Sequence, residues 1–167
     1  MPDELPDFDP RALLVRLAHG GVDFVVLGGV AATIHGSAAF TQDLDIAYAS
    51  DDANLDRLGA VLVALEARLR GVTDDVPFVP DGRTLRRARM LTLETRDGLL
   101  GLLAQPDGAP AYAQLRERAD RERIGGVEVL IASLDDLIAM KKAAGRMKDL
   151  VAVEELEAIK RLRRGPA

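Results

Sequence analysis

One segment near the start of the chain constrains the fold more than any other. The run Val22 to Leu27 is mostly apolar and β-branched, which predicts a buried strand. Gly28 and Gly29 close that strand, and the apolar run Val30 to Ile34 predicts a short helix that ends at Gly36. The segment therefore predicts an α/β (α+β) chain in which a helix starts directly at the end of a strand.

The two glycines lie where a phosphate group can approach the backbone. Glycine permits unusual dihedral angles and leaves no Cβ between the backbone and a bound group. The helix that follows has free N–H groups and a partial positive charge at its N-terminus, which suits a triphosphate. We therefore expect Gly28 and Gly29 to cradle phosphate.

A pair of carboxylates follows on the next predicted strand. Residues Asp43 to Tyr48 begin by alternating polar and apolar side chains, as in a strand with one buried face. Asp43 and Asp45 then project from the same face, about 7 Å apart along the strand. Carboxylates so placed can bind two Mg²⁺ ions, one activating an attacking hydroxyl and the other holding a triphosphate. A glycine pair alone is common in turns and an Asp-x-Asp alone is common on solvated strands and turns. The two together are more specific for a site that binds metal and triphosphate.

Composition indicates a globular protein with one domain, residues 1–167. Hydrophobic residues make up 48% of the chain and charged residues 29%, which is ordinary for a soluble protein. No cysteine is present, so disulfides and thiolate metal sites are excluded. The acidic N-terminus is the reverse of a targeting peptide, and no apolar run reaches membrane length. We expect a cytoplasmic protein with no membrane partner.

Charge gives little support to a nucleic-acid-binding surface. The formal net charge of −5 provides no global basic field. Two basic clusters are more typical of solvated helix faces or tails than of RNA contacts. They comprise Arg83, Arg86, Arg87 and Arg89, and Lys160, Arg161, Arg163 and Arg164.

The remaining elements are predicted from caps, turns and hydrophobic spacing. Helical spacing, N-cap residues and glycine stops mark the helices, and the pair Asp97-Gly98 is typical of a two-residue hairpin turn. The expected helices are Pro10 to His19, Asp51 to Leu69, Ala109 to Arg123, the helix from Ser133 to Gly145 and a last helix from Arg146; the expected strands are Met90 to Thr95, Leu99 to Leu103 and Val127 to Ile131, and 72–81 is expected to be a loop or short irregular strand.

Several of these segments together resemble the DNA polymerase β-like nucleotidyltransferase superfamily, and within it the small bacterial AbiEii-like and MNT-like proteins of toxin-antitoxin and defence loci. The resemblance is carried by Gly28-Gly29, His35-Gly36-Ser37, Thr41-Gln42-Asp43-Leu44-Asp45, Leu137 to Lys141, and Arg146 to Leu150. It implies a mixed β-sheet flanked by helices, with C-terminal helices, and a Mg²⁺-dependent transfer of a nucleotide from an NTP.

The resemblance also assigns roles to residues outside the two central motifs. It implies that Ser37 and Thr41 line the nucleotide site and that Lys141 and Arg146 face the nucleotide. Lys141 would supply a point charge to the triphosphate and Arg146 a planar set of donors. The alternative is a surface helix pair tied by salt bridges. Asp149 is expected to orient one of these cations, and His35 to form a hydrogen bond that positions the loop before the aspartates.

Two departures from the superfamily pattern bear on catalysis. Active members usually carry a third carboxylate on a strand like Leu99 to Leu103, where this chain has Gly101. If Asp97-Gly98 forms the hairpin turn, Glu94 lies opposite Gly101 and is the candidate replacement; the alternative is an exposed strand residue. Relatives also often place an arginine near Ala39.

Two functions from different classes remain open at this point. The first is an enzyme that transfers NMP from an NTP to an RNA such as tRNA, or to a protein; a small-molecule acceptor shares the same chemistry. The second is a degenerate, non-catalytic protein that binds nucleotide or a partner protein, such as a cognate toxin or antitoxin.

Overall fold

The computed structural model describes residues 4, 6–72 and 78–165, and it contains one mixed β-sheet between two layers of helices. The strands are β1 Phe24–Leu27, β2 Asp43–Tyr48, β3 Arg68–Leu69, β4 Met90–Thr95, β5 Gly98–Leu103, β6 Asp120–Ile124 and β7 Val127–Ile131. The helices are α1 Pro10–His19, α2 Gly28–His35, α3 Asp52–Ala64, α4 Gly82–Arg87, α5 Tyr112–Arg118, α6 Leu134–Ala144 and α7 Met147–Arg164.

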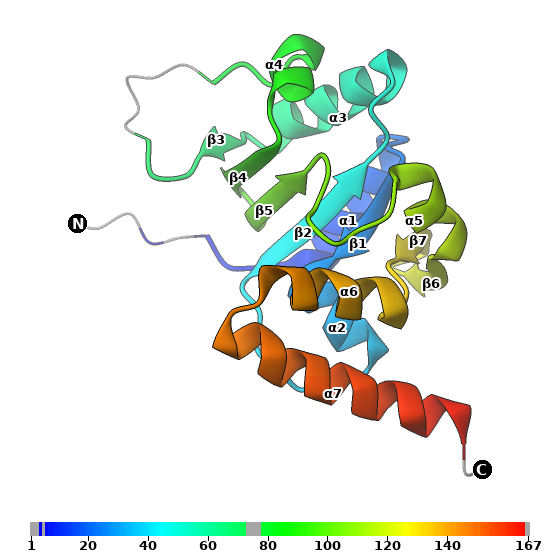
Figure 1. Ribbon diagram of the computed structural model, residues 1–167. Coiled ribbons are helices and arrows are strands. Elements are labelled where there is room, and N and C mark those ends of the chain that lie inside the picture. Colours follow the sequence, from blue (N-terminus) through cyan, green and yellow to red (C-terminus); the bar gives the residue numbers. More distant parts are fainter. Residues whose placement is uncertain (1–3, 5, 73–77, 166–167) are drawn as a thin grey trace.

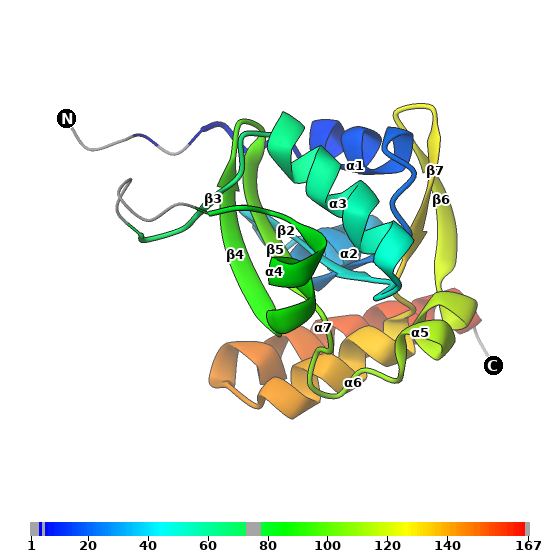
Figure 2. The ribbon, with the colours of Figure 1, turned by 90° about the horizontal axis from the view of Figure 1, so that it is seen from above.

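The sheet has seven strands in the order β3-β4-β5-β2-β1-β7-β6. β2 is parallel to β5 and β1 is parallel to β7, whereas the other neighbouring strands are antiparallel. Figures 1 and 2 show α1 and α3 on one face of the sheet and α2, α6 and α7 on the other. The predicted mixed sheet flanked by helices is confirmed.

The central strands form because both of their faces are covered. All four residues of β1 are buried, as its apolar sequence predicts. In β2 the apolar residues Leu44 and Ile46 are fully buried, and Asp43 and Asp45, which alternate with them, point to the opposite face. Leu100 and Leu102 of β5 are also fully buried, and the core continues from these strands to the helices on both faces of the sheet.

Local capping fixes the helix ends that the sequence predicts. The Asp9 side chain accepts a hydrogen bond from the Ala12 N–H at 2.9 Å, with Pro10 as the first helical residue. Ser133 accepts from the Asp136 N–H at 3.1 Å at the start of α6. α2 ends at Gly36, as expected.

Two predicted helices are shorter than expected. α3 ends at Ala64 rather than at Leu69, because the backbone of Glu66 turns to a φ of +53° and the chain continues into β3. The predicted helix 109–123 ends at Arg118 in α5, and the rest of that segment forms β6.

The β6 strand was missed because its turn was not recognised. Gly125 and Gly126 both have positive φ angles, of +58° and +82°. Two such residues in succession form the tight turn that matches the twist of an antiparallel hairpin. The glycine pair therefore joins the charged strand β6 to β7, and this pair is the signal that would have predicted it.

The β4–β5 hairpin forms, but its turn is not Asp97-Gly98. Thr95 pairs with Gly98, so that Arg96 and Asp97 make the two-residue turn. The Thr95 hydroxyl donates to the Gly98 carbonyl at 2.7 Å, and a Cβ on Gly98 would lie 2.8 Å from a ring carbon of Phe8. Local side-chain bonding and packing therefore set this turn.

Residues 73–77 of the predicted loop 72–81 lie outside the described residues, and 78–81 contain no helix or strand. The basic cluster around Arg86 lies partly on α4, a short helix that packs against α3. None of the helices in the described part of the chain has the length and apolar character needed to cross a membrane.

Candidate functional site

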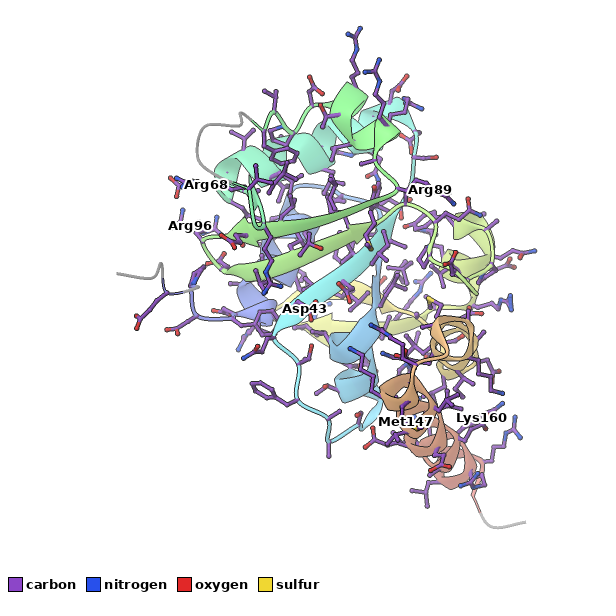
Figure 3. The ribbon with its side chains drawn as sticks, turned by 60° about the vertical axis from the view of Figure 1, so that its left-hand side comes forward. Asp43, Arg68, Arg89, Arg96, Met147 and Lys160 are labelled. Carbon is purple, nitrogen blue, oxygen red and sulfur yellow. The ribbon has the colours of Figure 1, made fainter. Side chains whose placement is uncertain are left out.

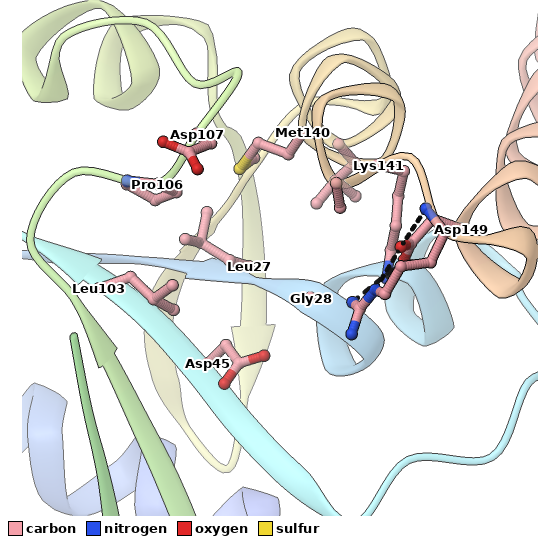
Figure 4. Close-up of a pocket in the computed structure, with 12 residues that line it drawn as sticks. Leu27, Gly28, Asp45, Leu103, Pro106, Asp107, Met140, Lys141 and Asp149 are labelled. Carbon is pink, nitrogen blue, oxygen red and sulfur yellow. Dashed lines mark hydrogen bonds and ion pairs between the residues drawn. The ribbon is translucent and has the colours of Figure 1, made fainter.

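The two aspartates project from the same face of β2, opposite to the face of Leu44 and Ile46. Figure 3 shows Asp43 at the start of β2, beside α2, and Figure 4 shows Asp45 two residues further along the strand. Asp45 is paired in register with Leu27 of β1 and with Gly101 of β5. Both aspartates are partly buried. The structure therefore places the Asp-x-Asp pair at the end of β1, where α2 begins.

The carboxylate of Asp45 is held between two glycines. A Cβ on Gly28 would lie 2.6 Å from Asp45 Oδ2, and a Cβ on Gly101 would collide with Asp45 Oδ1. Gly28 also has a φ of +62°, which side-chain-bearing residues rarely adopt. The two glycines on the neighbouring chain segments thus leave the space that Asp45 fills.

This packing changes the electrostatics of the carboxylate. Burial is the largest cause of a raised pKa, and the charge of Asp43 raises it further, to about 6 from the ordinary value of 3.8. The ammonium of Lys141 acts in the opposite direction. The pair of carboxylates thus repel each other in a partly desolvated place, which a bound cation would relieve.

Gly29 has the same kind of close neighbour. A Cβ on Gly29 would lie 2.7 Å from the Thr41 hydroxyl oxygen and 2.8 Å from Thr41 Cβ. The Thr41 hydroxyl in turn donates to the backbone carbonyl of Asp43 at 3.2 Å. The space that both glycines leave is therefore filled by protein side chains, and the phosphate role of their backbone stays a prediction.

Ser37 lies in the site, but its hydroxyl is already hydrogen-bonded. It donates to Glu155 of α7, and the Ala38 N–H donates to the other oxygen of Glu155 at 3.4 Å. Ala39 is exposed and donates its N–H to Ser37 Oγ at 3.1 Å. Glu155 ties the loop before β2 to α7. Sequence reasoning missed it, because the two partners are 118 residues apart.

The cationic residues meet at Asp149, which is 1% exposed. Arg146 Nε donates to Asp149 Oδ2 at 2.7 Å, and Lys141 Nζ lies 3.7 Å from Asp149 Oδ1 (Figure 4). The guanidinium of Arg146 is the largest cause of a lowered pKa at Asp149. The prediction that Asp149 orients a cation is confirmed, and it orients both. Lys141 remains the cation whose charge acts on Asp45.

His35 also plays the hydrogen-bonding role expected of it. Its Nε2 is 2.8 Å from the carbonyl oxygen of Ala132, at the end of β7, and the side chain is buried. This contact joins the end of α2 to the strand that precedes α6. The loop between Gly36 and Asp43 therefore starts from a fixed point.

Two adjoining cavities meet at these residues. The larger, here called the groove, has a volume of about 940 Å³ and is lined by the start of α2, the loop 37–42, both aspartates and α7. The smaller, here called the apolar pocket, has a volume of about 210 Å³ and lies among β1, β5 and α6. The residues that line both are Gly28, Asp45, Lys141, Arg146 and Asp149.

The predicted partner of Gly101 is wrong. Glu94 is paired with Leu99, and the residue opposite Gly101 is Thr92. The turn at Arg96 and Asp97 shifts the register by two residues from the expected one, which keeps each side chain on its predicted face but moves Glu94 along the strand. Among the described residues, no group of three or more histidine, cysteine or acidic side chains is arranged to hold a metal ion. Glu94 is therefore not opposite Gly101, and its role as a third carboxylate stays a prediction.

Comparisons with known proteins support the fold. No family model matches the sequence, and no curated protein matches it. Among solved structures, the lincomycin-bound lincosamide antibiotic adenylyltransferase LnuA is 12% identical, with a TM-score of 0.61 over 92% of this chain and 99% of that one. The antibiotic-resistance factor ANT(2'')-Ia is 16% identical, with a TM-score of 0.55 over 91% and 87% of the two chains.

A third solved structure shows the same likeness in fold. The antigenic nucleotidyltransferase-like protein from Paracoccidioides brasiliensis is 17% identical, with a TM-score of 0.55 over 91% of this chain and 73% of that one. At these identities the likeness concerns the fold alone. The chain has the nucleotidyltransferase fold.

Proposed function

We propose that the protein, acting as a single domain over residues 1–167, is a magnesium-dependent nucleotidyltransferase that transfers NMP from an NTP to an acceptor. One observation carries the proposal. Asp45 is packed beside Asp43 at the start of α2, with a raised pKa and with Lys141 acting on it from α6. A partly buried pair of acids that face a cation in a groove is a candidate for binding metal and phosphate.

The residues present fit a magnesium ion. Mg²⁺ is usually bound through one or two carboxylates together with substrate phosphates, rather than by a complete cage of protein ligands. Asp43 and Asp45 provide two carboxylates at the groove, and they would hold the ion. When bound, Mg²⁺ would supply charge neutralisation to the triphosphate and favour ionisation of the acceptor hydroxyl.

The groove supplies the other groups that a triphosphate needs. The N–H groups of Gly28 and Gly29 at the start of α2 would bind phosphate oxygens, with Ser37 and Thr41 beside them. Lys141 would neutralise phosphate charge, and Arg146 would contribute the donors that Asp149 leaves free.

The acceptor is proposed to be an RNA, such as a tRNA, or a protein. The AbiEii-like and MNT-like pattern of the sequence supports a place in a bacterial toxin-antitoxin or defence system in the cytoplasm, with a cognate partner protein. LnuA is described as a lincosamide antibiotic adenylyltransferase and ANT(2'')-Ia as an antibiotic-resistance factor. A small-molecule acceptor is therefore the competing proposal within the same chemistry.

A second candidate function is favoured by the packing of Gly101. Because Asp45 fills the space beside Gly101, a third carboxylate has no room at the usual place. Together with the absence of arginine at Ala39, this supports a protein that binds nucleotide without transferring it, for instance as an antitoxin.

A transfer assay separates the two candidates. The protein is incubated with Mg²⁺, each radiolabelled NTP in turn, and either total cellular RNA or total protein. The proposal expects label in one fraction, lost in Asp45→Asn and kept in Asp56→Asn, a matched change at an exposed aspartate on α3. Magnesium-dependent NTP binding without any transfer would establish the second candidate, and the absence of both would overturn the proposal.

A further inference from the structure

The apolar pocket is a separate compartment that opens on the aspartate site. Its walls are Leu27 at the end of β1, Leu103 at the end of β5, and Leu137 and Met140 of α6, with Pro106 closing one side (Figure 4). It meets the groove at Asp45 and Lys141. A group bound in the pocket would therefore be next to a phosphate held at the aspartates.

One carboxylate at this pocket has no partner. Asp107 lines the pocket from the loop between β5 and α5, and none of the described residues forms a hydrogen bond or ion pair with its side chain. The loop itself is held in place. A Cβ on the next residue, Gly108, would lie 2.6 Å from the Ala139 carbonyl oxygen and 2.7 Å from Ala143 Cβ, so the loop backbone packs directly on α6. Asp107 is exposed, and its carboxylate is a hydrogen-bond acceptor without a partner among the described residues, on a loop whose backbone packs against α6.

We propose that the apolar pocket binds the nucleobase of the NTP and that Asp107 selects guanine. This inference rests on the proposed function, because it places the base of the same NTP whose phosphates lie at Asp43 and Asp45. It assigns Asp107 as a specificity-determining residue.

The size and lining of the pocket fit a nucleobase. Its volume of about 210 Å³ is below the range of roughly 300–1,000 Å³ that is usual for drug-sized ligands, so it suits one planar ring system. Apolar side chains on both sides of a base, with polar groups at its edge, are the usual way in which a protein holds an unstacked base. A macromolecular acceptor needs the larger, open groove instead.

The chemistry of a carboxylate points to guanine among the bases. An ionised carboxylate only accepts hydrogen bonds, through two oxygens side by side. Guanine presents two adjacent donors on its Watson–Crick edge, N1–H and the N2 amino group. Adenine and cytosine present one amino group beside an acceptor, and uracil presents one N–H between two carbonyls. Asp107 can therefore accept two hydrogen bonds from guanine but only one from each of the other bases. It also repels the carbonyl oxygens of uracil.

Calorimetric titration of the whole protein with GTP, ATP, CTP and UTP in Mg²⁺, without acceptor, tests this assignment. We expect wild type to bind GTP at least about ten-fold more tightly than ATP or UTP, as a good bidentate contact provides. Asp107→Asn should lose this preference and gain affinity for ATP, because a carboxamide pairs with adenine through one donor and one acceptor. Asp56→Asn is the matched control and should keep the wild-type order.

A second variant tests the location without relying on Asp107. Ala144 lines the pocket from an exposed position on α6, so Ala144→Phe should fill the pocket while the fold is kept. It should weaken all four NTPs towards the affinity of tripolyphosphate, whose own binding should not change.

The outcomes separate this inference from the proposed function. If the four NTPs bind wild type with equal affinity, or if Asp107→Asn keeps the order of wild type, the base assignment is overturned while phosphate binding stands. If Ala144→Phe leaves NTP binding unchanged but blocks transfer to an acceptor, the pocket holds the acceptor and the assignment is equally overturned. If neither NTPs nor tripolyphosphate bind, the proposed function fails with it.

Discussion

The packing of Asp45 explains why glycines stand at two positions around it. Gly28 and Gly101 flank its two carboxylate oxygens, one from each side. Glycine at position 101 is therefore a packing requirement of Asp45. Residue identity at position 101 and the orientation of Asp45 are coupled.

This coupling makes Gly101→Ala destabilising although it adds only a methyl group. The new Cβ would displace Asp45, and overpacking of this kind costs about 1–3 kcal/mol. Urea unfolding of Gly101→Ala, Asp45→Gly and the double variant measures it. We expect the double variant to lose less stability than the sum of the single ones. Strict additivity would show that the two residues do not compete for space.

The raised pKa of Asp45 gives the stability of the protein a defined pH dependence. A carboxyl with a folded-state pKa of about 6, above the ordinary 3.8, binds its proton more tightly in the folded state. The contribution of Asp45 to the free energy of unfolding is therefore fully present below pH 3.8 and is lost as the pH rises through about 6.

Asp45→Asn removes the ionisable group and with it the loss of stability at neutral pH. In metal-free buffer at pH 7.5 the variant should be more stable than wild type by on the order of 2 kcal/mol, and the difference should disappear near pH 3.8. Urea unfolding at both pH values checks it, with Asp56→Asn as the control for removal of an acid elsewhere. A variant that is less stable than wild type at pH 7.5 would contradict the repulsive environment assigned to Asp45.

At the scale of elements, the start of α7 and the end of α6 are held together by one buried acid. Asp149 accepts from both the side chain and the backbone N–H of Arg146 and forms an ion pair with Lys141 of α6. The position of Lys141 at the groove therefore depends on Asp149. This contact holds the end of α6 and the start of α7 together as one wall of the site.

Asp149→Asn should weaken the contact between α6 and α7, and the resulting loss of stability should depend on pH. The pKa of Asp149 is lowered in the folded state, so its stabilisation is fully present above pH 3.8 and is lost as the pH falls further. Thermal unfolding should show a lower Tm for the variant at pH 7 and a smaller difference near pH 3. Glu154→Gln, at an exposed position of α7, is the matched control. An equal Tm for wild type and variant at pH 7 would contradict the structural role of Asp149.

The sequence predicted the elements with strong local signals and missed those set by distant contacts. The glycine pair, α2 and the faces of β2 follow from apolar periodicity and glycine positions, and they are as expected. The register of β4 and β5 does not follow from the Asp97-Gly98 pair, because Phe8 packs on Gly98 and Thr95 bonds across the turn. A shift of two residues preserves faces, so Glu94 stays on the face of Gly101 although its partner is Leu99.

The sequence also predicted several residues that line the candidate site. Asp43, Asp45, Lys141 and Arg146 all line one groove, although they come from three different elements. Glu155 was missed because its hydrogen-bond partner Ser37 is 118 residues away in the sequence. Asp107 was missed because it lies in a loop that carries no recognisable motif.

At the scale of the whole molecule, helices pack on both faces of the sheet, and the site lies on only one of these faces. α1 and α3 cover the buried side chains of β2 and β5, whereas α2, α6 and α7 surround the two aspartates (Figure 2). Changes at Asp43 and Asp45 should therefore affect binding without removing core contacts. This separation allows the central claim to be tested on folded variants.

The most direct test is calorimetric titration of GTP and ATP into wild type, Asp45→Asn and Asp56→Asn, each with Mg²⁺ and again with EDTA. Two carboxylates that hold Mg²⁺ against the triphosphate predict magnesium-dependent binding by wild type and by Asp56→Asn. They also predict at least about ten-fold weaker binding by Asp45→Asn, since a lost charge-assisted contact is typically worth 1.5–3 kcal/mol. Binding that is equally tight in EDTA, or that is unchanged in folded Asp45→Asn, would contradict it.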